Sequence, residues 1–412
     1  MSVRVLGLAA FRREVEQRRN ARTFDDALLR TVRATLDDVR RRGDAAVLAN
    51  VRRFDRRTAR TADLWVDRSA LRRAARSCPR ELRAALDDAH AAIAAFHRRQ
   101  RPRPISHAAR AFAEALVPEA LARVGGCVPR GTVGYPSTAL MIGVPARIAG
   151  VADLVLVSPM PRDGAVDPAL AYAATLVGAS GLYRAGGAAA VAALAYGTKT
   201  LARVAKIVGP GNAYTTAAKW LVSADVGIDA LQGPSELIVL ASSDADPDVL
   251  ALDLLAQAEH GAGAFAALVS DDADLLRAVD RALATQPKAR VFTYRARDLR
   301  SAARAADEAA PEHVLLAGRA AAALAAQVRH AGAVFVGMRS AVAFGDYVAG
   351  TNHSLPTGGT ARWASALRVE DFVRWTSRVS LRGDLRGLAR AGAAIAEHEG
   401  MRFHRASMEA RA

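Results

Sequence analysis

Four short segments place acid–base and metal-binding side chains where the neighbouring sequence is apolar or glycine-rich. They are Gln257 to His260, Glu312-His313, Asp346 to His353 and Glu399 to His404. Gln257 and His260 are three residues apart, so on a helix both reach the same point. A carboxylate beside an imidazole, as in Glu312-His313, supplies general acid–base chemistry near neutral pH. Histidine nitrogens with carboxylate and amide oxygens suit zinc or a similar divalent ion.

Two glycine clusters indicate tight turns or anion sites. Val208 to Tyr214 (VGPGNAY) follows an expected strand and opens an expected helix, so its N–H groups could face an anion. Gln232 to Glu236 (QGPSE) leads into another expected strand. Neither matches the dinucleotide fingerprint GxGxxG, and a plain turn explains each equally well.

The elements that must hold these residues follow from periodicity. We expect long helices over Phe24–Arg42, Ala45–Phe54 and Ser69–Arg99, with Asp44 and Ser69 as N-caps of the second and third. Arg101-Pro102-Arg103-Pro104 breaks the pattern and marks a boundary.

After this boundary, apolar strands alternate with alanine-rich helices. The alternation predicts parallel sheets with crossover helices, and the continuous apolar runs predict sheets covered on both faces. The expected strands are Val151–Ser158, Val204–Val208, Glu236–Ala241, Phe265–Ser270, Val291–Tyr294 and Ala333–Val336. From Val369 the pattern returns to charged amphipathic helix, and no internal repeat is visible.

Composition excludes several classes of protein. The 412 residues are 51% hydrophobic, which allows a large core. No run of 18 apolar residues lacks charge, so we expect no membrane span. The cysteines, Cys78 and Cys127, are far apart, which disfavours disulfide scaffolds and thiolate zinc sites. Without a secretory signal at the N-terminus, the cytoplasm is the expected location.

The net charge of +16 lies mostly in the first 110 residues, which hold 27 arginines and 13 acidic residues. Such a region could bind nucleic acid or an acidic partner. Its arginines alternate with acids at helical spacing and lack interleaved aromatics, so we favour a solvated helical surface and consider nucleic acid unlikely.

Several motifs together resemble the histidinol dehydrogenase family. They are residues 209–241 (GPGNAYTTAAKWLVSADVGIDALQGPSELIVLA), Asp253 to His260, Ala310 to His313, Gly345 to Tyr347, Asn352 to Thr357 and Glu399 to His404. They stand in the family's order, and with weaker likeness before them the resemblance covers residues 20–408.

The resemblance implies an α/β fold of two incomplete Rossmann-like domains in a homodimer. The implied first domain combines 24–126, with the N-terminal helices, and 236–368, with the catalytic and metal residues; the second, on the cofactor side, is 127–235. The implied extensions are 1–23 at the N-terminus and 369–412 at the C-terminus, the latter reaching into the partner's site.

The resemblance also implies the chemistry: zinc-dependent, NAD-linked oxidation of an amino alcohol, L-histidinol, through the aldehyde to L-histidine in two hydride transfers. It implies Gln257, His260, Asp346 and His404 as ligands of one zinc per subunit, and Glu312 with His313 as the acid–base pair. Substrate contacts would be the four zinc ligands, Ser235, His313, His353 and Glu399. Asn212 would contact NAD.

Departures from the family pattern leave other readings open. Three positions differ from the residues usual in the family: Gly261, Leu315 and Thr351. A paralogue that acts on another amino alcohol or polyol is therefore the alternative. Cys127 and Ala189 stand where the family has a tyrosine and a glutamine at the NAD site, so we do not assign those two contacts and expect weakened NAD binding.

Overall fold

The computed structural model describes residues 6–20, 24–109, 112–261, 263–284, 286 and 290–412. The chain forms two compact units. Unit 1 comprises the residues up to Gln100 together with Leu121–Phe372, and unit 2 comprises Arg101–Ala120 with Val373–Ala412. No helix among the described residues is long and apolar enough to cross a bilayer.

Unit 1 contains two parallel sheets, of which sheet A carries the sequence-predicted catalytic pair. Its strand order is β1-β12-β11-β10-β13-β14. The strands are β1 (Leu6–Gly7), β10 (Glu236–Ala241), β11 (Phe265–Ser270), β12 (Val291–Arg295), β13 (His313–Ala317) and β14 (Ala333–Val336). The helices of this half are α1 (Leu8–Asn20), α10 (Pro247–Ala258), α11 (Ala273–Leu283), α12 (Leu299–Ala309), α13 (Arg319–Ala322) and α14 (Val342–Tyr347).

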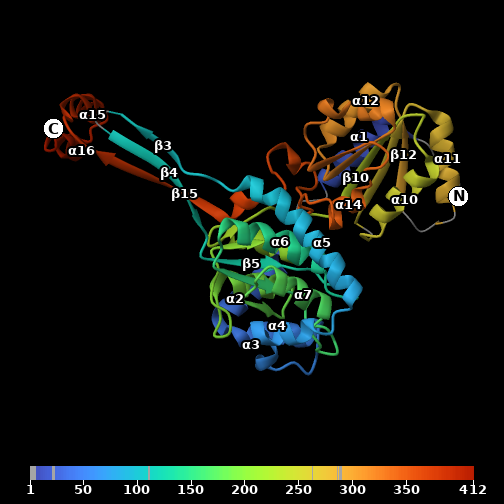
Figure 1. Ribbon diagram of the computed structural model, residues 1–412, viewed down its shortest axis with the longest axis horizontal. Helices are drawn as coiled ribbons and strands as arrows, with labels where there is room; N and C mark the ends of the chain where they lie inside the picture. Colours follow the sequence, from blue (N-terminus) through green and yellow to red (C-terminus); the bar gives the residue numbers. More distant parts are fainter. Residues whose placement is uncertain (1–5, 21–23, 110–111, 262, 285, 287–289) are drawn as a thin grey trace. The chain divides into compact units, whose positions relative to one another are not determined.

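Helices cover both faces of sheet A, as Figure 1 shows. Along β10, Ile238 and Leu240 pack into the core shared with α1 and α12, whereas Leu237 and Val239 pack into the core shared with α10 and α11. Because successive strand side chains point to opposite faces, a strand buried on both must be apolar throughout. The continuous apolar runs of the sequence therefore predicted this arrangement correctly.

Sheet B has the order β2-β7-β6-β5-β8-β9. Its strands are β2 (Trp65–Asp67), β5 (Arg123–Cys127), β6 (Asp153–Val157), β7 (Gly181–Tyr183), β8 (Lys206–Val208) and β9 (Gly227–Ile228), and only β2 is antiparallel to its neighbour. One face is covered by α2 (Asp26–Arg42), α3 (Asp44–Phe54), α8 (Gly187–Tyr196) and α9 (Ala213–Val222). The other is covered by α4 (Arg68–Ala75), α5 (Arg80–His97), α6 (Pro136–Ala149) and α7 (Pro168–Leu176).

The two sheets share one topology, although the sequence shows no repeat. In each, the first central strand (β10 or β5) is followed by two strands on one side and then by two strands on the other. The direction of winding therefore switches between β10 and β13 in sheet A and between β5 and β8 in sheet B. The N-terminal helices α2–α5 pack on sheet B, which differs from the grouping with residues 236–368 expected from the sequence.

Unit 2 is an antiparallel sheet of order β15-β4-β3 followed by two helices. Its elements are β3 (Ile105–Ala108), β4 (Phe112–Ala120), β15 (Val373–Leu381), α15 (Arg386–His398) and α16 (Arg402–Glu409). Large apolar side chains are exposed on it, including Val379 at 66%, Ile395 at 60% and Phe403 at 72%. Exposed apolar surface of this kind is typical of an interaction surface.

Four local expectations are wrong. Residues 373–381, expected to be part of a helical region, form strand β15 instead. The single helix expected over Ser69–Arg99 is broken, because α4 ends at Ala75 and α5 begins only after Pro79. Asp67, rather than Ser69, caps α4 by accepting from Ala70 N at 2.7 Å. Asp44 lies inside α3 after Gly43, and its carboxylate instead accepts hydrogen bonds from Thr200.

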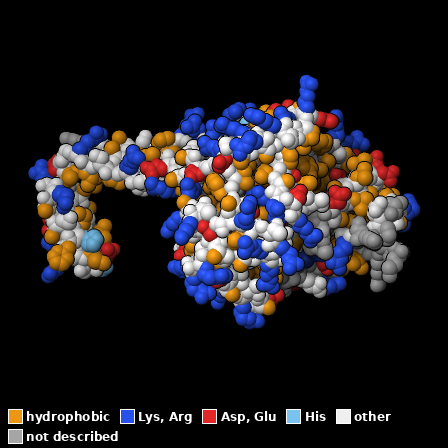
Figure 2. Space-filling view, turned by 90° about the horizontal axis from the view of Figure 1, so that it is seen from below, with side chains coloured by type: hydrophobic (Ala, Val, Ile, Leu, Met, Phe, Trp, Pro, Cys, Tyr) orange, Lys and Arg blue, Asp and Glu red, His pale blue; other side chains and the backbone are white. Residues whose placement is uncertain are grey.

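The arginines of the N-terminal helices pair locally with acids, as in Arg42 with Asp38 and Arg60 with Asp63. On the face shown in Figure 2, basic side chains are interspersed with acidic and hydrophobic ones. This distribution is that of a solvated helical surface.

Candidate active site

Glu312 is a buried carboxylate at the amino end of β13. Its Oε2 accepts hydrogen bonds from Ser235 Oγ at 2.6 Å and from Glu236 N at 3.0 Å. These donors lie at the start of strand β10. Because β10 and β13 are parallel and paired, the starts of both strands lie at the same edge of sheet A. Burial raises the pKa of Glu312 to about 7 against the lowering effect of the two hydrogen bonds. The carboxyl group therefore exchanges a proton near neutral pH.

Three histidines are each held through Nδ1 by a backbone carbonyl group. The Nδ1 atoms of His260, His313 and His353 lie 3.2, 3.1 and 2.9 Å from the backbone carbonyls of Gln257, Glu236 and Asp346. A carbonyl only accepts, so Nδ1 carries the hydrogen in each ring. When the ring is neutral, Nε2 is then free to accept a proton or bind a metal.

Burial keeps two of these rings neutral near pH 7. Desolvation lowers the pKa of His313, and it lowers that of His353 to about 4. Nε2 of His313 is therefore a proton acceptor, and Nδ1 of the same ring lies 3.5 Å from Glu312 Oε2.

The first predicted ligand pair comes from the end of α10. The helix ends at Ala258, so His260 lies in the following turn rather than on the helix. Gln257 is 3% exposed, and its Nε2 donates to Ser235 Oγ at 3.0 Å. This bond fixes the orientation of the amide. The amide oxygen remains available to bind a metal.

Asp346, at the end of α14, belongs to the same cluster. Desolvation raises the pKa of Asp346, and its electrostatic interaction with the nearby imidazoles of His313 and His260 opposes this. The structure thus brings together seven sequence-predicted residues: Ser235, Gln257, His260, Glu312, His313, Asp346 and His353.

This cluster offers a metal an imidazole nitrogen, a carboxylate and an amide oxygen, which suits zinc in chemistry. Among the described residues, no three His, Cys, Asp or Glu side chains are grouped to hold an ion by themselves. The remaining predicted ligand, His404, lies exposed on α16 of unit 2, and Glu399 lies exposed after α15. Unit 1 therefore holds three of the four expected ligands.

Asn212 lies apart from this cluster, at the carboxyl edge of sheet B. It caps α9 by accepting from Thr215 N at 3.1 Å. The turn Gly209–Asn212 follows β8, and residues 127–130 follow β5, so the two segments flank the point where the winding of sheet B switches. We call these segments the sheet B crevice; open α/β sheets bind nucleotides at such points.

The two residues that depart from the family pattern at the expected cofactor site are both internal. Cys127 is 5% exposed and Ala189 is 3% exposed, and both pack in the same core cluster. Burial raises the pKa of Cys127 to about 12, so its thiol is inert. Gly187, at the start of α8, has φ +60 and open space where a Cβ would stand. The carboxyl edge of sheet B is thus open at this helix start.

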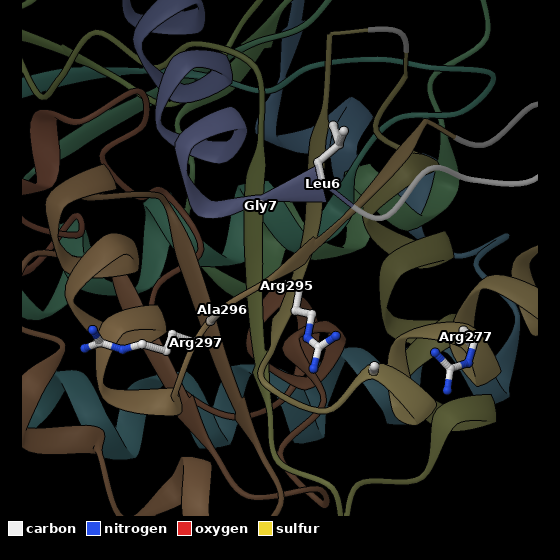
Figure 3. A pocket seen from close by; sticks show the side chains of 7 residues that line it. Leu6, Gly7, Arg277, Arg295, Ala296 and Arg297 are labelled. Atoms are coloured by element: carbon white, nitrogen blue, oxygen red, sulfur yellow. The ribbon is translucent and has the colours of Figure 1, made fainter.

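A cavity of about 590 Å³ lies elsewhere, at the carboxyl edge of sheet A between β12 and α11. Figure 3 shows Arg277 and Arg295 on either side of it and Arg297 pointing away. Of the residues that the structure describes, no histidine or carboxylate lines it, so this lining lacks the acid–base groups of the cluster described above.

Sequence reasoning missed Glu236. Its Oε2 accepts from Glu312 N at 3.3 Å and from Gly358 N at 2.8 Å, so it fixes the backbone that carries the predicted acid–base pair. The signal was present, because Glu236 opens an otherwise apolar strand. A buried network around Lys219 was also missed, although Lys219 is one of only four lysines.

Comparisons with known proteins identify the family. A family model described as histidinol dehydrogenase matches residues 17–412. The histidinol dehydrogenases of Bradyrhizobium diazoefficiens and Rhodopseudomonas palustris are each 43% identical over 396 residues, spanning 91% of this chain and 90% of theirs. A crystal structure of histidinol dehydrogenase from Elizabethkingia anophelis superimposes with a TM-score of 0.87 at 29% identity, covering 94% of this chain and 93% of that one.

The match extends over both sheets and both units, as well as the motifs that supply the clustered residues. The protein is thus an oxidoreductase, and the chain belongs to the histidinol dehydrogenase family.

Proposed function

We propose that the protein oxidises L-histidinol through the aldehyde to L-histidine, with zinc bound and with NAD⁺ accepting two hydrides. The observation that carries the proposal is the buried Glu312–His313 pair, which lies beside His260, Gln257 and Asp346. A proton acceptor and a carboxyl group that titrates near neutral pH thus lie beside the three residues that we propose as zinc ligands.

His313 acts as the base in the first step. Its Nδ1–H is held by the Glu236 carbonyl, so its Nε2 faces the site as an acceptor. Removing the proton from the alcohol oxygen lets a hydride leave the adjacent carbon. The neutral ring, favoured by burial, is the form that this step needs.

Glu312 acts in the second step, which consumes water. The aldehyde is hydrated before the second hydride leaves, and a carboxylate can take the proton from the attacking water. Oε2 of Glu312 is engaged by Ser235 and Glu236, and Oε1 has no hydrogen-bond partner among the described residues. Oε1 is therefore the oxygen assigned to this proton.

Zinc would be held by Gln257, His260 and Asp346, with the partner's His404 as fourth ligand in a homodimer. When bound, it would orient the amine and imidazole of the substrate. Ser235 and His353 lie close enough to this cluster to contact substrate. The partner's Glu399 supplies a carboxylate for the cationic amine.

The homodimer is supported by the apolar surface of unit 2 and by the incomplete ligand set of unit 1. NAD⁺ is assigned to the sheet B crevice, with Asn212 in contact. The assignment is supported by the switch point and by the open start of α8.

The experiment is an assay of NADH formation with L-histidinol on the zinc-loaded protein, with and without chelator. The proposal requires turnover that a chelator abolishes and zinc restores. The absence of turnover in the zinc-loaded protein would refute the substrate while leaving the family membership intact.

None of the departures from the family favours a paralogue with another substrate. Leu315 is buried in the core of sheet A and Thr351 is exposed. Gly261 has φ +103, a conformation that glycine adopts without strain. A panel of amino alcohols and polyols beside histidinol tests this, and a preference of only a few-fold for histidinol would favour the paralogue.

A further inference from the structure

Lys219 is a buried cation that the proposed chemistry does not use. It lies on α9, and its side chain is 1% exposed. Its Nζ donates to the Gly209 carbonyl at 2.9 Å, to Gln232 Oε1 at 3.0 Å and to the Asp229 carboxylate. All three ammonium hydrogens are therefore used.

Asp229 completes the arrangement from just beyond β9. Its side chain is 4% exposed, and its Oδ2 accepts from Gly209 N at 2.7 Å and from Gln232 Nε2 at 3.2 Å. The ion pair thus holds both backbone polar groups of Gly209 and both polar atoms of the Gln232 amide.

The hydrogen bonds to Gly209 fix the backbone conformation of the turn that this residue opens. It opens the Gly209–Asn212 turn with φ +98, and a Cβ there would lie 2.5 Å from the Cys127 carbonyl oxygen. The turn is therefore pressed against the end of β5, directly at the sheet B crevice. A glycine has many other conformations available, and a satisfied buried polar network selects one.

Through Gln232 and Gly233, the Lys219–Asp229 network is also connected to the segment that carries Ser235. The Gln232 carbonyl accepts from Thr216 Oγ1 at 2.8 Å, and Gly233 N donates to Thr357 Oγ1 at 2.6 Å. Ser235, two residues further on, donates to Glu312. One buried ion pair thus anchors both the crevice turn and the segment that leads to the acid–base pair.

We infer that Lys219 and Asp229 are positioning residues, which fix the crevice turn relative to the Ser235–Glu312 segment and thereby set cofactor affinity. The inference rests on the proposed binding of NAD⁺ at the sheet B crevice. Buried ion pairs often add little net stability compared with apolar replacements, so a role in geometry explains this pair better than stability alone.

The test uses the full-length, zinc-loaded protein carrying Lys219→Met with Asp229→Asn, which leaves no unpaired charge. Three readouts are compared with wild type: NAD⁺ affinity by calorimetry, the KM values for NAD⁺ and histidinol, and amide hydrogen exchange of peptides covering residues 207–216. The melting temperature reports folding.

The matched control is Arg123→Met with Asp153→Asn. This removes the ion pair at the amino ends of β5 and β6, the edge opposite the crevice. A purely structural role would lower the melting temperature in both double variants with no change in NAD⁺ affinity.

We expect NAD⁺ affinity to fall at least 10-fold in the Lys219/Asp229 variant and exchange over 207–216 to accelerate, with a smaller rise in the KM for histidinol. The control should change none of these. A folded variant with wild-type affinity and exchange would overturn the inference.

If the double variant does not fold, Lys219→Arg decides by the same readouts. A planar guanidinium cannot reproduce the three-way contact of the ammonium, so an intermediate loss of affinity is expected. Wild-type affinity and exchange in Lys219→Arg would overturn the inference. If wild type itself fails to bind NAD⁺, the proposed function fails, and exchange over 207–216 still reports whether the pair holds the turn.

Discussion

Sheets A and B have the same strand order but present polar groups at opposite edges. In sheet A, Glu312 and His313 lie at the amino end of β13, beside Ser235 and Glu236 at the amino end of β10. In sheet B, the crevice lies at the carboxyl ends of β5 and β8. The same topology thus supports acid–base groups at one edge and a nucleotide-type crevice at the other.

The carboxyl edge of sheet A shows why the two differ. At its switch point, Asp244 accepts from Ser242 Oγ at 2.6 Å and from Arg319 N at 3.0 Å, and these bonds lower its pKa to about 2. A carboxylate of the chain thus stands where an anionic ligand would bind in an open sheet. Strand order thus locates possible sites, while loop residues decide which one is open.

The largest effect is expected from a truncation after Arg390, which removes Glu399 and His404. If the C-terminal segment completes the partner's site, zinc and activity are both lost. Zinc affinity should fall by more than the roughly 10–100-fold typical of losing a hydrogen-bond partner of a ligand. Metal analysis and turnover measure this.

Mixing the truncation with a full-length Glu312→Gln/His313→Ala variant should restore some activity, because one site in the heterodimer is then complete. Full zinc content in the truncated protein would contradict the shared site.

Glu312→Gln tests the amino edge of sheet A. The variant should slow aldehyde oxidation by about 10²–10⁴-fold and affect alcohol oxidation less, whereas His313→Ala should slow both steps. Single-turnover measurements with histidinol and with the aldehyde separate the two. Equal slowing of both steps in Glu312→Gln would argue against its role with water.

The pH dependence of Glu312 has a definite sign. Its pKa is about 7 in the folded protein against 4.5 in the unfolded chain, so the folded state binds the proton more tightly. Its contribution to stability is full below pH 4.5 and is lost as pH rises through about 7. Aldehyde oxidation should rise through the same interval, and Glu312→Gln should abolish both changes. Denaturant unfolding and rate profiles between pH 5 and 9 measure them.

Ser235→Ala sharpens this account. Loss of a hydrogen bond to the carboxylate raises the pKa of Glu312 further, so the inflection in aldehyde oxidation should move to higher pH. The measurement is the same profile, and an unmoved inflection would show that the Ser235 contact does not act on Glu312.

Ala189→Gln with Cys127→Tyr tests the sheet B crevice. We expect wild type to bind NAD⁺ more weakly than family members with the usual tyrosine and glutamine, and the double substitution to regain about 5–150-fold. Calorimetry measures the affinity. Because both positions are internal, overpacking would cost about 1–3 kcal/mol of stability, which melting curves detect. Tight binding by wild type with no gain in the variant would contradict the expectation.

The smallest effect is expected at the switch point of sheet A, where the Asp244 carboxylate lies. Asp244→Asn weakens the hydrogen bond to Arg319 N and should leave NAD⁺ affinity within about twofold, with a small loss of stability. A large loss of NAD⁺ affinity would mean that the cofactor lies at sheet A instead.

The elements of the sheets were predictable because burial on both faces leaves continuous apolar runs. β10, β11 and β14 begin and end where the sequence predicts. Strand β13 was missed, because its apolar residues follow directly on Pro311-Glu312-His313, whose polar character conceals the strand. The polar motifs predicted which residues converge in unit 1.

Other features could not be predicted from the sequence. The Lys219–Asp229 pair joins residues ten apart, one on helix α9 and the other just after strand β9. No sequence pattern indicates that these two residues are in contact. The common strand order of the two sheets is likewise invisible, since it depends on topology and not on repeated residues.

The most direct test of the opposite-edge arrangement is amide hydrogen exchange of the zinc-loaded protein with and without saturating NAD⁺. The account predicts protection in peptides covering residues 127–131, 186–190 and 209–213, at the carboxyl edge of sheet B. It predicts none in peptides covering 242–244 and 318–321. Protection at the latter peptides, with none at the former, would contradict it.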